Sequence, residues 1–323
     1  MKKIALTIGD PAGIGPEIVV KALLSPRLHD WLPVVIGDRC AVEAALELLG
    51  TSLTIEAVDT VGGNVPLPER LPLIDPGSLD SFKRSMPDAN NGRASVGYIK
   101  KAVALAMEGK VDAIVTAPIS KEALSLAGFP WPGHTEMLAE LTATSEYAMM
   151  LTGGPLRVIL VTIHAAIKQV PSLITRERVL KTILLAKKAC EMVGIGDPRI
   201  AVAGLNPHAG ESGIFGREEI EAIRPAIDEA RRNDITVDGP FPPDVIFFRA
   251  YRREVDIVVC MYHDQGLIPL KMIAFDTGVN VTVGLPIIRT SPDHGTAYDI
   301  AWRGIADPAS MIEAISLASM LRL

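Results

Sequence analysis

The sequence predicts an α/β protein with a mostly parallel sheet. Strand-like apolar runs alternate with helix-like segments along its 323 residues, which is the pattern of strands covered by helices. Several runs are continuously apolar, as in strands that are buried on both faces. A chain of this length is too long to form only one small hydrophobic core, so two lobes or one large α/β unit are expected.

The first 141 residues are expected to form strand–helix pairs interrupted by one irregular stretch. Pro16 is well placed to begin the first helix, because a proline at the first helical position loses no hydrogen bond. Between about Val61 and Ala94 proline, glycine and asparagine are dense, so a long excursion with at most one short strand is expected. The expected strands are residues 3–8, 33–37 and 111–118; the expected helices are 16–24, 39–50, 95–109, a short one after Pro118, and one that follows the turn 129–136 and ends at Leu141.

The remainder of the chain continues the alternation after a hairpin. Two strands, 147–152 and 156–163, are joined at Gly153 and Gly154, and a helix over 175–193 has apolar positions three to four residues apart. The closing helix, within 307–323, is expected to be capped by Asp307 or Ser310. Between them we expect a strand ending near Gly204, a charged helix around 217–232, and strands at 256–261 and 279–284.

Composition narrows the functional class. The chain has 32 basic and 38 acidic residues, a net charge of −6, and no basic block, which argues against a nucleic-acid partner. The cysteines, Cys40, Cys190 and Cys260, have no paired spacing and are expected to be reduced thiols. The first apolar run stops at Gly9-Asp10-Pro11, and no stretch approaches the roughly 20 apolar residues of a membrane span, so a cytoplasmic protein is expected.

Three histidines each follow an apolar, strand-like run and open into a loop of small polar residues. They are His164, His208 and His263. Ligands gather at the carboxyl ends of strands in open α/β sheets, and three imidazoles there can bind one divalent cation while leaving positions open for substrate. A hydrogen-bonding loop residue is the ordinary alternative for each. His134 and His294 lie in similar glycine-rich turns, whereas His29 has no such context.

Polar neighbours of these histidines are candidates for orienting the imidazoles, as partners of metal ligands commonly do. They are Asn206, Glu211, Asp264 and Gln265. Asp244 follows a proline-rich turn and projects from a loop, but an N-cap of the following helix explains it equally well.

Two glycine motifs precede expected helices. Gly13 and Gly15 form an incomplete dinucleotide fingerprint, for which a tight turn using positive φ is the favoured explanation. His134 and Thr135 follow Gly133 at a helix start whose amides can bind an anion, although Thr135 can equally be only an N-cap.

Lys271, Asn280 and Arg289 lie in a stretch that is otherwise poor in charge. Arg289 directly follows the apolar run 285–288 and is therefore expected at a strand end. Ammonium and guanidinium groups suit a phosphate or carboxylate, and together the three residues favour a ligand over surface salt bridges.

With these motifs in place, the chain resembles the 4-hydroxythreonine-4-phosphate dehydrogenase family. The matching strings occur in family order over nearly the whole chain: GDPAGIGPE, VTAPISK, GHTE, the strand before His164, GLNPHAGE, FGREE, MYHDQG, GVNVTVGLPIIRTSPDHGTA and DIAWRG. The resemblance implies a two-lobed α/β/α fold like that of isocitrate and isopropylmalate dehydrogenases, with the active site in the cleft between lobes. One lobe would comprise 1–125 and 290–323 on the cofactor side, and the other 126–289 with the metal and the dimer interface.

The resemblance also implies roles for individual residues. His164, His208 and His263 match the divalent-metal ligands, which in the family assemble across a homodimer with one ligand from the partner. His134, Thr135, Lys271, Asn280 and Arg289 match substrate-binding positions. The segment around His294, Gly295, Thr296 and Asp299 is similar to an adenosine-binding loop for NAD or NADP. Candidates for the proton acceptor are Lys271, Asp244 and Asp264.

The implied reaction is oxidation of the 3-hydroxyl of a 4-phosphorylated hydroxy acid, followed by decarboxylation, with zinc, magnesium, manganese or cobalt as the metal. Segments such as 240–247 and 266–275 favour 4-phospho-D-threonate or 4-phospho-D-erythronate; the alternative substrate is 4-phosphohydroxy-L-threonine of vitamin B6 synthesis. Two other classes are a three-histidine metallohydrolase, which needs no nicotinamide, and a non-catalytic sensor of phosphorylated metabolites.

Overall fold

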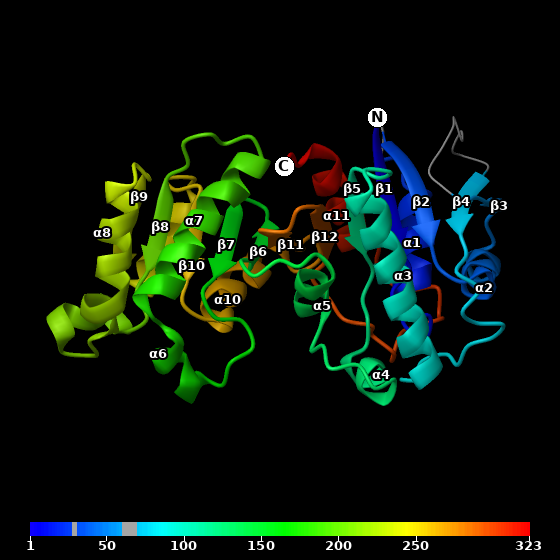
Figure 1. The fold of residues 1–323 in the computed structure, drawn as a ribbon, viewed down its shortest axis with the longest axis horizontal. Helices are drawn as coiled ribbons and strands as arrows, with labels where there is room; N and C mark the ends of the chain where they lie inside the picture. The colour runs from blue at the N-terminus through cyan, green and yellow to red at the C-terminus, as the bar shows by residue number, and fades with distance from the viewer. Residues whose placement is uncertain (28–30, 60–69) are drawn as a thin grey trace. The chain divides into compact units, whose positions relative to one another are not determined.

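A computed structural model describes residues 1–27, 31–59 and 70–323. They form two compact units, unit 1 of residues 1–145 and 285–321 and unit 2 of residues 146–284 (Figure 1). The lobes expected from the sequence have different boundaries, which lie between residues 125 and 126 and between residues 289 and 290. His29 and residues 61–69 of the expected excursion lie outside the described residues.

Unit 1 is built on parallel strands in the order β3-β4-β2-β1-β5-β12, and each neighbouring pair is parallel. The central strands are continuously apolar and buried, as the sequence predicts. The strands are β1 (Lys2–Thr7), β2 (Trp31–Ile36), β3 (Thr54–Ala57), β4 (Arg70–Ile74), β5 (Ala113–Thr116) and β12 (Ile288–Pro292).

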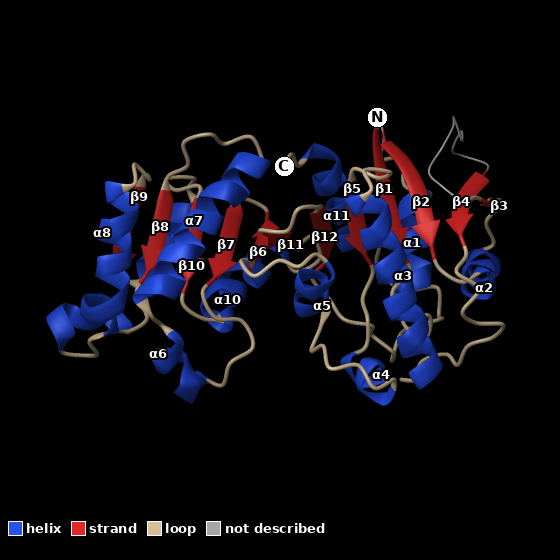
Figure 2. Cartoon of the chain, in the orientation of Figure 1, coloured by secondary structure: helices blue, strands red, loops and turns tan. Residues whose placement is uncertain are grey.

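Helices follow the strands of unit 1 as expected (Figure 2). One helix begins earlier than expected, and the capping of another differs in part. The helix expected over 95–109 starts at Ala89, because the Asp88 carboxylate accepts a hydrogen bond from the Asn90 amide at 2.8 Å and caps it. Ser310 does not cap the last helix: its hydroxyl accepts from the Asp293 amide, while Asp307 accepts from Ala309. The helices are α1 (Gly15–Leu23), α2 (Arg39–Leu49), α3 (Ala89–Met107), α4 (Lys121–Leu126), α5 (His134–Leu141) and α11 (Ala309–Met320).

Unit 2 has the strand order β11-β6-β7-β10-β8-β9. The expected hairpin is confirmed, since β6 pairs antiparallel with β7; β11 also pairs antiparallel with β6, and the neighbours from β7 to β9 are parallel. The strands are β6 (Ala148–Gly153), β7 (Leu156–Leu160), β8 (Ile200–Ala203), β9 (Val237–Phe241), β10 (Ile257–Cys260) and β11 (Val279–Val283).

Both faces of the unit 2 strands are covered. Val158, Val258 and Ala201 share one buried cluster with Ile246 of α9 and Leu270 of α10, whereas the alternate residues, which point to the other face, are buried too. α7 packs on β8 and β10. The helices are α6 (Val170–Leu173), α7 (Arg176–Met192), α8 (Arg224–Arg232), α9 (Pro243–Tyr251) and α10 (His263–Ala274), with short turns η1 (Ile167–Gln169), η2 (Pro207–Gly213) and η3 (Glu219–Ile223).

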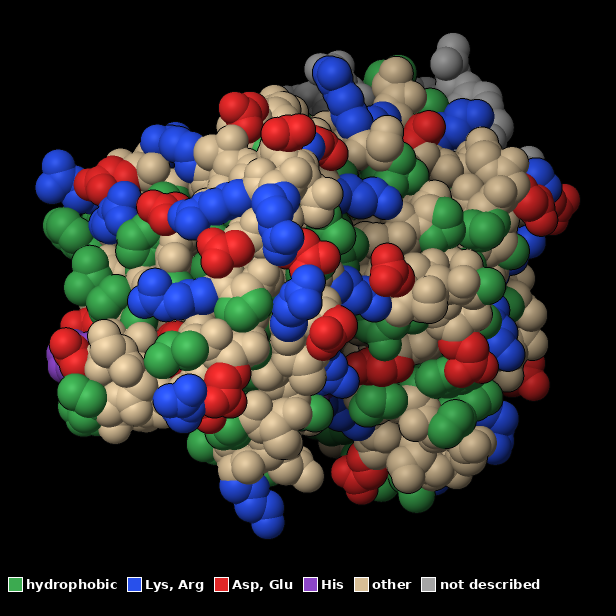
Figure 3. Space-filling model, turned by 60° about the vertical axis from the view of Figure 1, so that its left-hand side comes forward, with side chains coloured by type: hydrophobic (Ala, Val, Ile, Leu, Met, Phe, Trp, Pro, Cys, Tyr) green, Lys and Arg blue, Asp and Glu red, His purple; other side chains and the backbone are tan. Residues whose placement is uncertain are grey.

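The α/β fold class predicted from the sequence is therefore confirmed. Within the described ranges, no helix has the length and apolar character needed to cross a bilayer. Basic and acidic side chains are intermixed over the face drawn in Figure 3.

Candidate active site

The three histidines predicted as metal ligands follow three adjacent parallel strands of unit 2. His164 lies after β7, His263 is the first residue of α10 after β10, and His208 lies in η2 after β8. Because β7, β10 and β8 are neighbours and parallel, all three loops leave the same edge of the sheet.

His164 and His263 approach each other closely. Their ring centroids are 6.0 Å apart. His263 Nδ1 lies 2.7 Å from Asp264 Oδ1, so a proton on Nδ1 donated to the carboxylate leaves Nε2 as the lone-pair nitrogen. A carboxylate that accepts from one ring nitrogen commonly orients a histidine metal ligand, so His164 and His263 are candidates to share one divalent cation.

His208 is presented by an unusual backbone turn. Residues 208–212 all have positive φ, between 42° and 79°, which is costly for residues other than glycine. The turn is held by the buried carboxylate of Glu219, whose Oε1 accepts from the amides of Leu205 and Asn206 at 2.8 Å each. Within the described part of one chain, no group of three or more His, Cys, Asp and Glu side chains is arranged to hold a metal ion.

The expected orienting residues divide into two kinds. Asp264 contacts an imidazole, whereas Asn206 donates to Glu218 and Glu219, and Gln265 bonds to the backbone. Glu211 is exposed.

α10 forms one wall of a hollow of about 430 Å³. Its lining includes His263, Asp264 and Lys271, so two candidate proton acceptors share a surface with one candidate metal ligand. The Lys271 ammonium lies 5.6 Å from the ring centroid of Phe275. Asp244 is exposed in the first turn of α9 and makes no capping hydrogen bond there, so the N-cap alternative is wrong for it. Asn280 lies in β11 with its Oδ1 buried and unbonded among the described residues.

Unit 1 contains a buried cationic site on its strand β12. Arg289 is 2% exposed and lies inside β12, not at a strand end as expected, and its Nε and Nη2 donate to Thr116 Oγ1 at 3.1 and 2.8 Å. Burial lowers the pKa of Arg289 to about 9, which leaves the guanidinium charged at neutral pH.

His134 is held beside this guanidinium. Burial, and then the Arg289 charge, lower the pKa of His134 well below its ordinary value, so the imidazole is neutral. Its Nε2 is buried without a hydrogen-bond partner among the described residues. α5 begins at His134 with Gly133 as its cap, so Thr135 is not the N-cap, and no side chain caps the first amides. A cation, a helix start and an unsatisfied imidazole together suit an anionic group.

The expected cofactor loop packs against the loop after β1. Thr296 O accepts from the Ile14 amide at 3.0 Å, and the Tyr298 hydroxyl donates to Asp10 Oδ2 at 2.6 Å. Gly13 lacks positive φ; a Cβ there would meet Thr296 O at 2.8 Å. Close approach of this loop, rather than the positive φ expected, therefore requires glycine at 13. His294 Nδ1 lies 3.2 Å from Gly295 O, and Asp299 is exposed.

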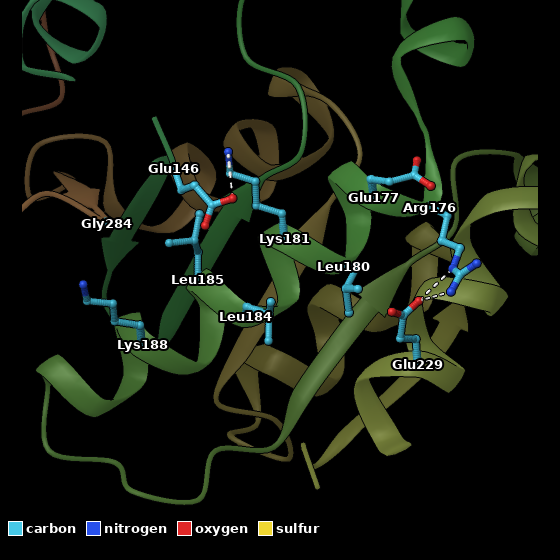
Figure 4. A pocket seen from close by; sticks show the side chains of 10 residues that line it. All are labelled: Glu146, Arg176, Glu177, Leu180, Lys181, Leu184, Leu185, Lys188, Glu229 and Gly284. Atoms are coloured by element: carbon cyan, nitrogen blue, oxygen red, sulfur yellow. Dashed lines mark hydrogen bonds and ion pairs between the residues drawn. The ribbon is translucent and has the colours of Figure 1, made fainter. Parts of the chain in front are cut away.

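A hollow of about 610 Å³ on α7 carries none of the predicted site residues (Figure 4). Several of its charged side chains pair with one another: Arg176 with Glu229, and Lys181 with Glu146 at 3.7 Å between Nζ and Oε1. The candidate chemistry therefore lies at the strand ends and not in this hollow.

Comparisons with known proteins identify the family that this chain is similar to. A family model described as pyridoxal phosphate biosynthetic protein PdxA matches residues 30–318. A 4-hydroxythreonine-4-phosphate dehydrogenase of Desulforapulum autotrophicum is 50% identical over 98% of this chain and 94% of that protein. A D-threonate 4-phosphate dehydrogenase of Pectobacterium atrosepticum is 46% identical over 99% of both chains. The crystal structure of a 4-hydroxythreonine-4-phosphate dehydrogenase from Klebsiella pneumoniae has a TM-score of 0.92 at 44% identity, covering 99% of this chain and 97% of that one.

Proposed function

The chain belongs to the PdxA family of pyridoxal phosphate biosynthetic proteins, and on that premise we propose that it is a nicotinamide- and metal-dependent dehydrogenase of a small 4-phosphorylated hydroxy acid. The observation that carries the proposal is the placement of His164, His208 and His263 after three adjacent parallel strands, with His263 oriented by Asp264. Dehydrogenase names of relatives at 46–50% identity support it.

The three histidines would hold a divalent cation. When bound, that cation would lower the pKa of the substrate's secondary alcohol and stabilise the enolate formed on decarboxylation. With Nδ1 donating to Asp264, His263 would present Nε2 to the cation. Asp264 is engaged by His263 through Oδ1, so we prefer Lys271 in its neutral form, which shares the α10 hollow with His263, as the proton acceptor.

Arg289, His134 and the first amides of α5 would bind an anionic end of the substrate. Arg289 supplies a buried positive charge, and neutral His134 supplies a hydrogen-bonding nitrogen without a competing partner among the described residues. Thr116 fixes the guanidinium plane. His294, Gly295, Thr296 and Asp299 would bind the adenosine part of NAD or NADP, in a loop fixed by Asp10 and Tyr298.

The substrate class can be tested directly. Purified protein is supplied in turn with Mg²⁺, Mn²⁺, Zn²⁺ or Co²⁺, NAD or NADP, and 4-phospho-D-threonate, 4-phospho-D-erythronate or 4-phosphohydroxy-L-threonine. We expect nicotinamide reduction with the first two exceeding that with the third, metal dependence, and one CO₂ released for each nicotinamide reduced. Negligible reduction with all three would overturn the substrate class, and reduction without CO₂ would remove the decarboxylation step.

A second copy of this chain would complete the site. α9 and α10 expose large apolar side chains at helical spacing, including Phe248 (62% exposed), Met272 (82%) and Phe275 (72%). Exposed apolar patches of this kind mark interfaces. Met272 also lines the hollow that contains His263, so a homodimer formed through this surface would place partner atoms beside the metal ligands.

A further inference from the structure

Gln265 ties together the loops that carry two of the three histidines. It is 7% exposed and lies in the first turn of α10, two residues after His263. Its Oε1 accepts from the Met261 amide at 2.6 Å, and its Nε2 donates to Gly204 O at 2.7 Å. Met261 directly follows β10, and Gly204 directly follows β8, so one amide side chain spans the two strand ends.

The third strand end is joined to the same point. The Thr162 hydroxyl, 4% exposed in the segment after β7, donates to Met261 O at 2.7 Å, and the Thr162 amide donates to the same oxygen at 3.2 Å. Met261 is therefore bonded on both sides: its N–H donates to Gln265, and its carbonyl accepts two hydrogen bonds from Thr162. The loops to His164, His263 and His208 leave from these connected positions.

The backbone at Gly204 is closely surrounded by neighbouring atoms. A Cβ at 204 would meet Ala209 Cα at 2.9 Å and Glu219 Oε1 at 3.1 Å, so the backbone there is pressed against the turn that presents His208. A displacement of Gly204 O would therefore be transmitted to residues 205–209 rather than absorbed. An amide is needed because one end must accept and the other must donate.

We propose that Gln265 is a positioning residue that fixes the backbone from which the His263 and His208 loops leave, and thereby raises the affinity for the divalent cation. It does so through the backbone, without touching an imidazole. This inference rests on the proposed metal site. Groups that position metal ligands typically contribute about 10- to 100-fold in affinity, and that is the effect expected here.

The test compares Gln265→Met with a matched control. The methionine keeps the length of the side chain and removes both hydrogen bonds. Thr182→Val is the control, because the Thr182 hydroxyl is also buried (5% exposed) and also bonds to a backbone carbonyl, Arg178 O at 2.9 Å, but within α7. Titration calorimetry of the metal-free full chain with Mn²⁺ and with Zn²⁺ measures the dissociation constant of each ion. Amide hydrogen exchange measures the protection of residues 204–213 and 261–264.

We expect Gln265→Met to weaken Mn²⁺ binding by about 10- to 100-fold and to speed amide exchange in residues 204–213 and 261–264, while NAD binding stays unchanged. Thr182→Val should lower the melting temperature without either change. A Gln265→Met protein that is folded and binds Mn²⁺ within twofold of wild type would overturn the inference, as would equal weakening in Thr182→Val. If Gln265→Met does not fold, Gln265→Glu, which keeps the acceptor to Met261, takes its place with the same expectation. Failure of wild type to bind either ion would instead overturn the proposed function.

Discussion

The buried cationic site of unit 1 and the histidine site of unit 2 differ in how completely each unit builds them. In unit 1 the charged group is inside the protein: Arg289 is 2% exposed, and the neighbouring His134 has a buried, unsatisfied Nε2 among the described residues. In unit 2 the loops are fixed by buried groups, yet His164 and His208 are exposed. The anion site is thus desolvated before any ligand arrives, whereas the histidine site is rigid at its base and open at its surface.

The difference suits the two sites to different tasks. A buried cation interacts strongly with an anion because little water screens it, which favours tight and selective anchoring. Exposed imidazoles on loops that leave fixed strand ends can bind a cation and contact a substrate and a second protein surface. Changes in the two sites should therefore have different signatures in kinetics and stability.

The largest effect is expected from His208→Ala. Loss of one of three ligands should reduce kcat by roughly 1000-fold or more, because the cation no longer stabilises the developing charge. The fold should persist, since His208 is exposed and the turn is held by Glu219. Steady-state kinetics and circular dichroism measure both. Glu211→Ala, an exposed change in the same left-handed turn, is the control; full activity of His208→Ala would remove it from the metal site.

Arg289→Met should act mainly on substrate binding. Removing the buried guanidinium is expected to raise KM by about 100-fold, in line with the 2–5 kcal/mol typical of a lost buried charge contact. Stability should hold or rise, because a buried charge is replaced by an apolar chain of similar length. Arg176→Met, at the exposed pair with Glu229, is the control. An unchanged KM would show that the anion binds elsewhere.

Met272→Lys should weaken the proposed dimer. A charge placed on the apolar α10 surface would have to be desolvated on association, so we expect a dissociation constant raised by about tenfold or more and activity that depends on protein concentration. Sedimentation measured over a range of concentrations checks this. Met320→Lys, 63% exposed in unit 1, is the control. A wild-type chain that is monomeric at all concentrations would refute the dimer.

The sequence predicted the fold best where strands are buried. β8 and β10 are continuous apolar runs, and β7 is apolar except for Arg157. The histidines after these strands stand out because each follows a buried run and opens into polar residues. The edge strands β3 and β9 were not predicted. Their residues are mostly exposed or half-buried, so they carry no apolar run. The family resemblance is confirmed by the match over residues 30–318.

The contacts between distant loops could not be predicted in this way. Gln265, Glu219 and Thr162 bond to backbone atoms, and a backbone partner leaves no mark in the sequence of the partner. Gly13 was assigned to positive φ because the segment that crowds it, at Thr296, lies far along the chain. Arg289 was expected at a strand end because it directly follows the apolar run 285–288, whereas β12 begins only at Ile288.

The smallest expected effect concerns pH and unit 1 alone. Burial and the Arg289 charge hold the pKa of His134 well below the ordinary 6.5, so below about pH 6.5 the unfolded chain binds a proton that the folded chain does not. The stability contributed by the neutral imidazole is therefore complete above pH 6.5 and is lost as pH falls, by at most about 1.4 kcal/mol for each pH unit. His134→Gln should flatten this slope in urea titrations between pH 5 and 7.5. Thr135→Val, a buried change without a titrating group, should shift stability equally at every pH; an unchanged slope in His134→Gln would mean that the folded protein protonates His134 readily and that the two sites do not differ in desolvation as described.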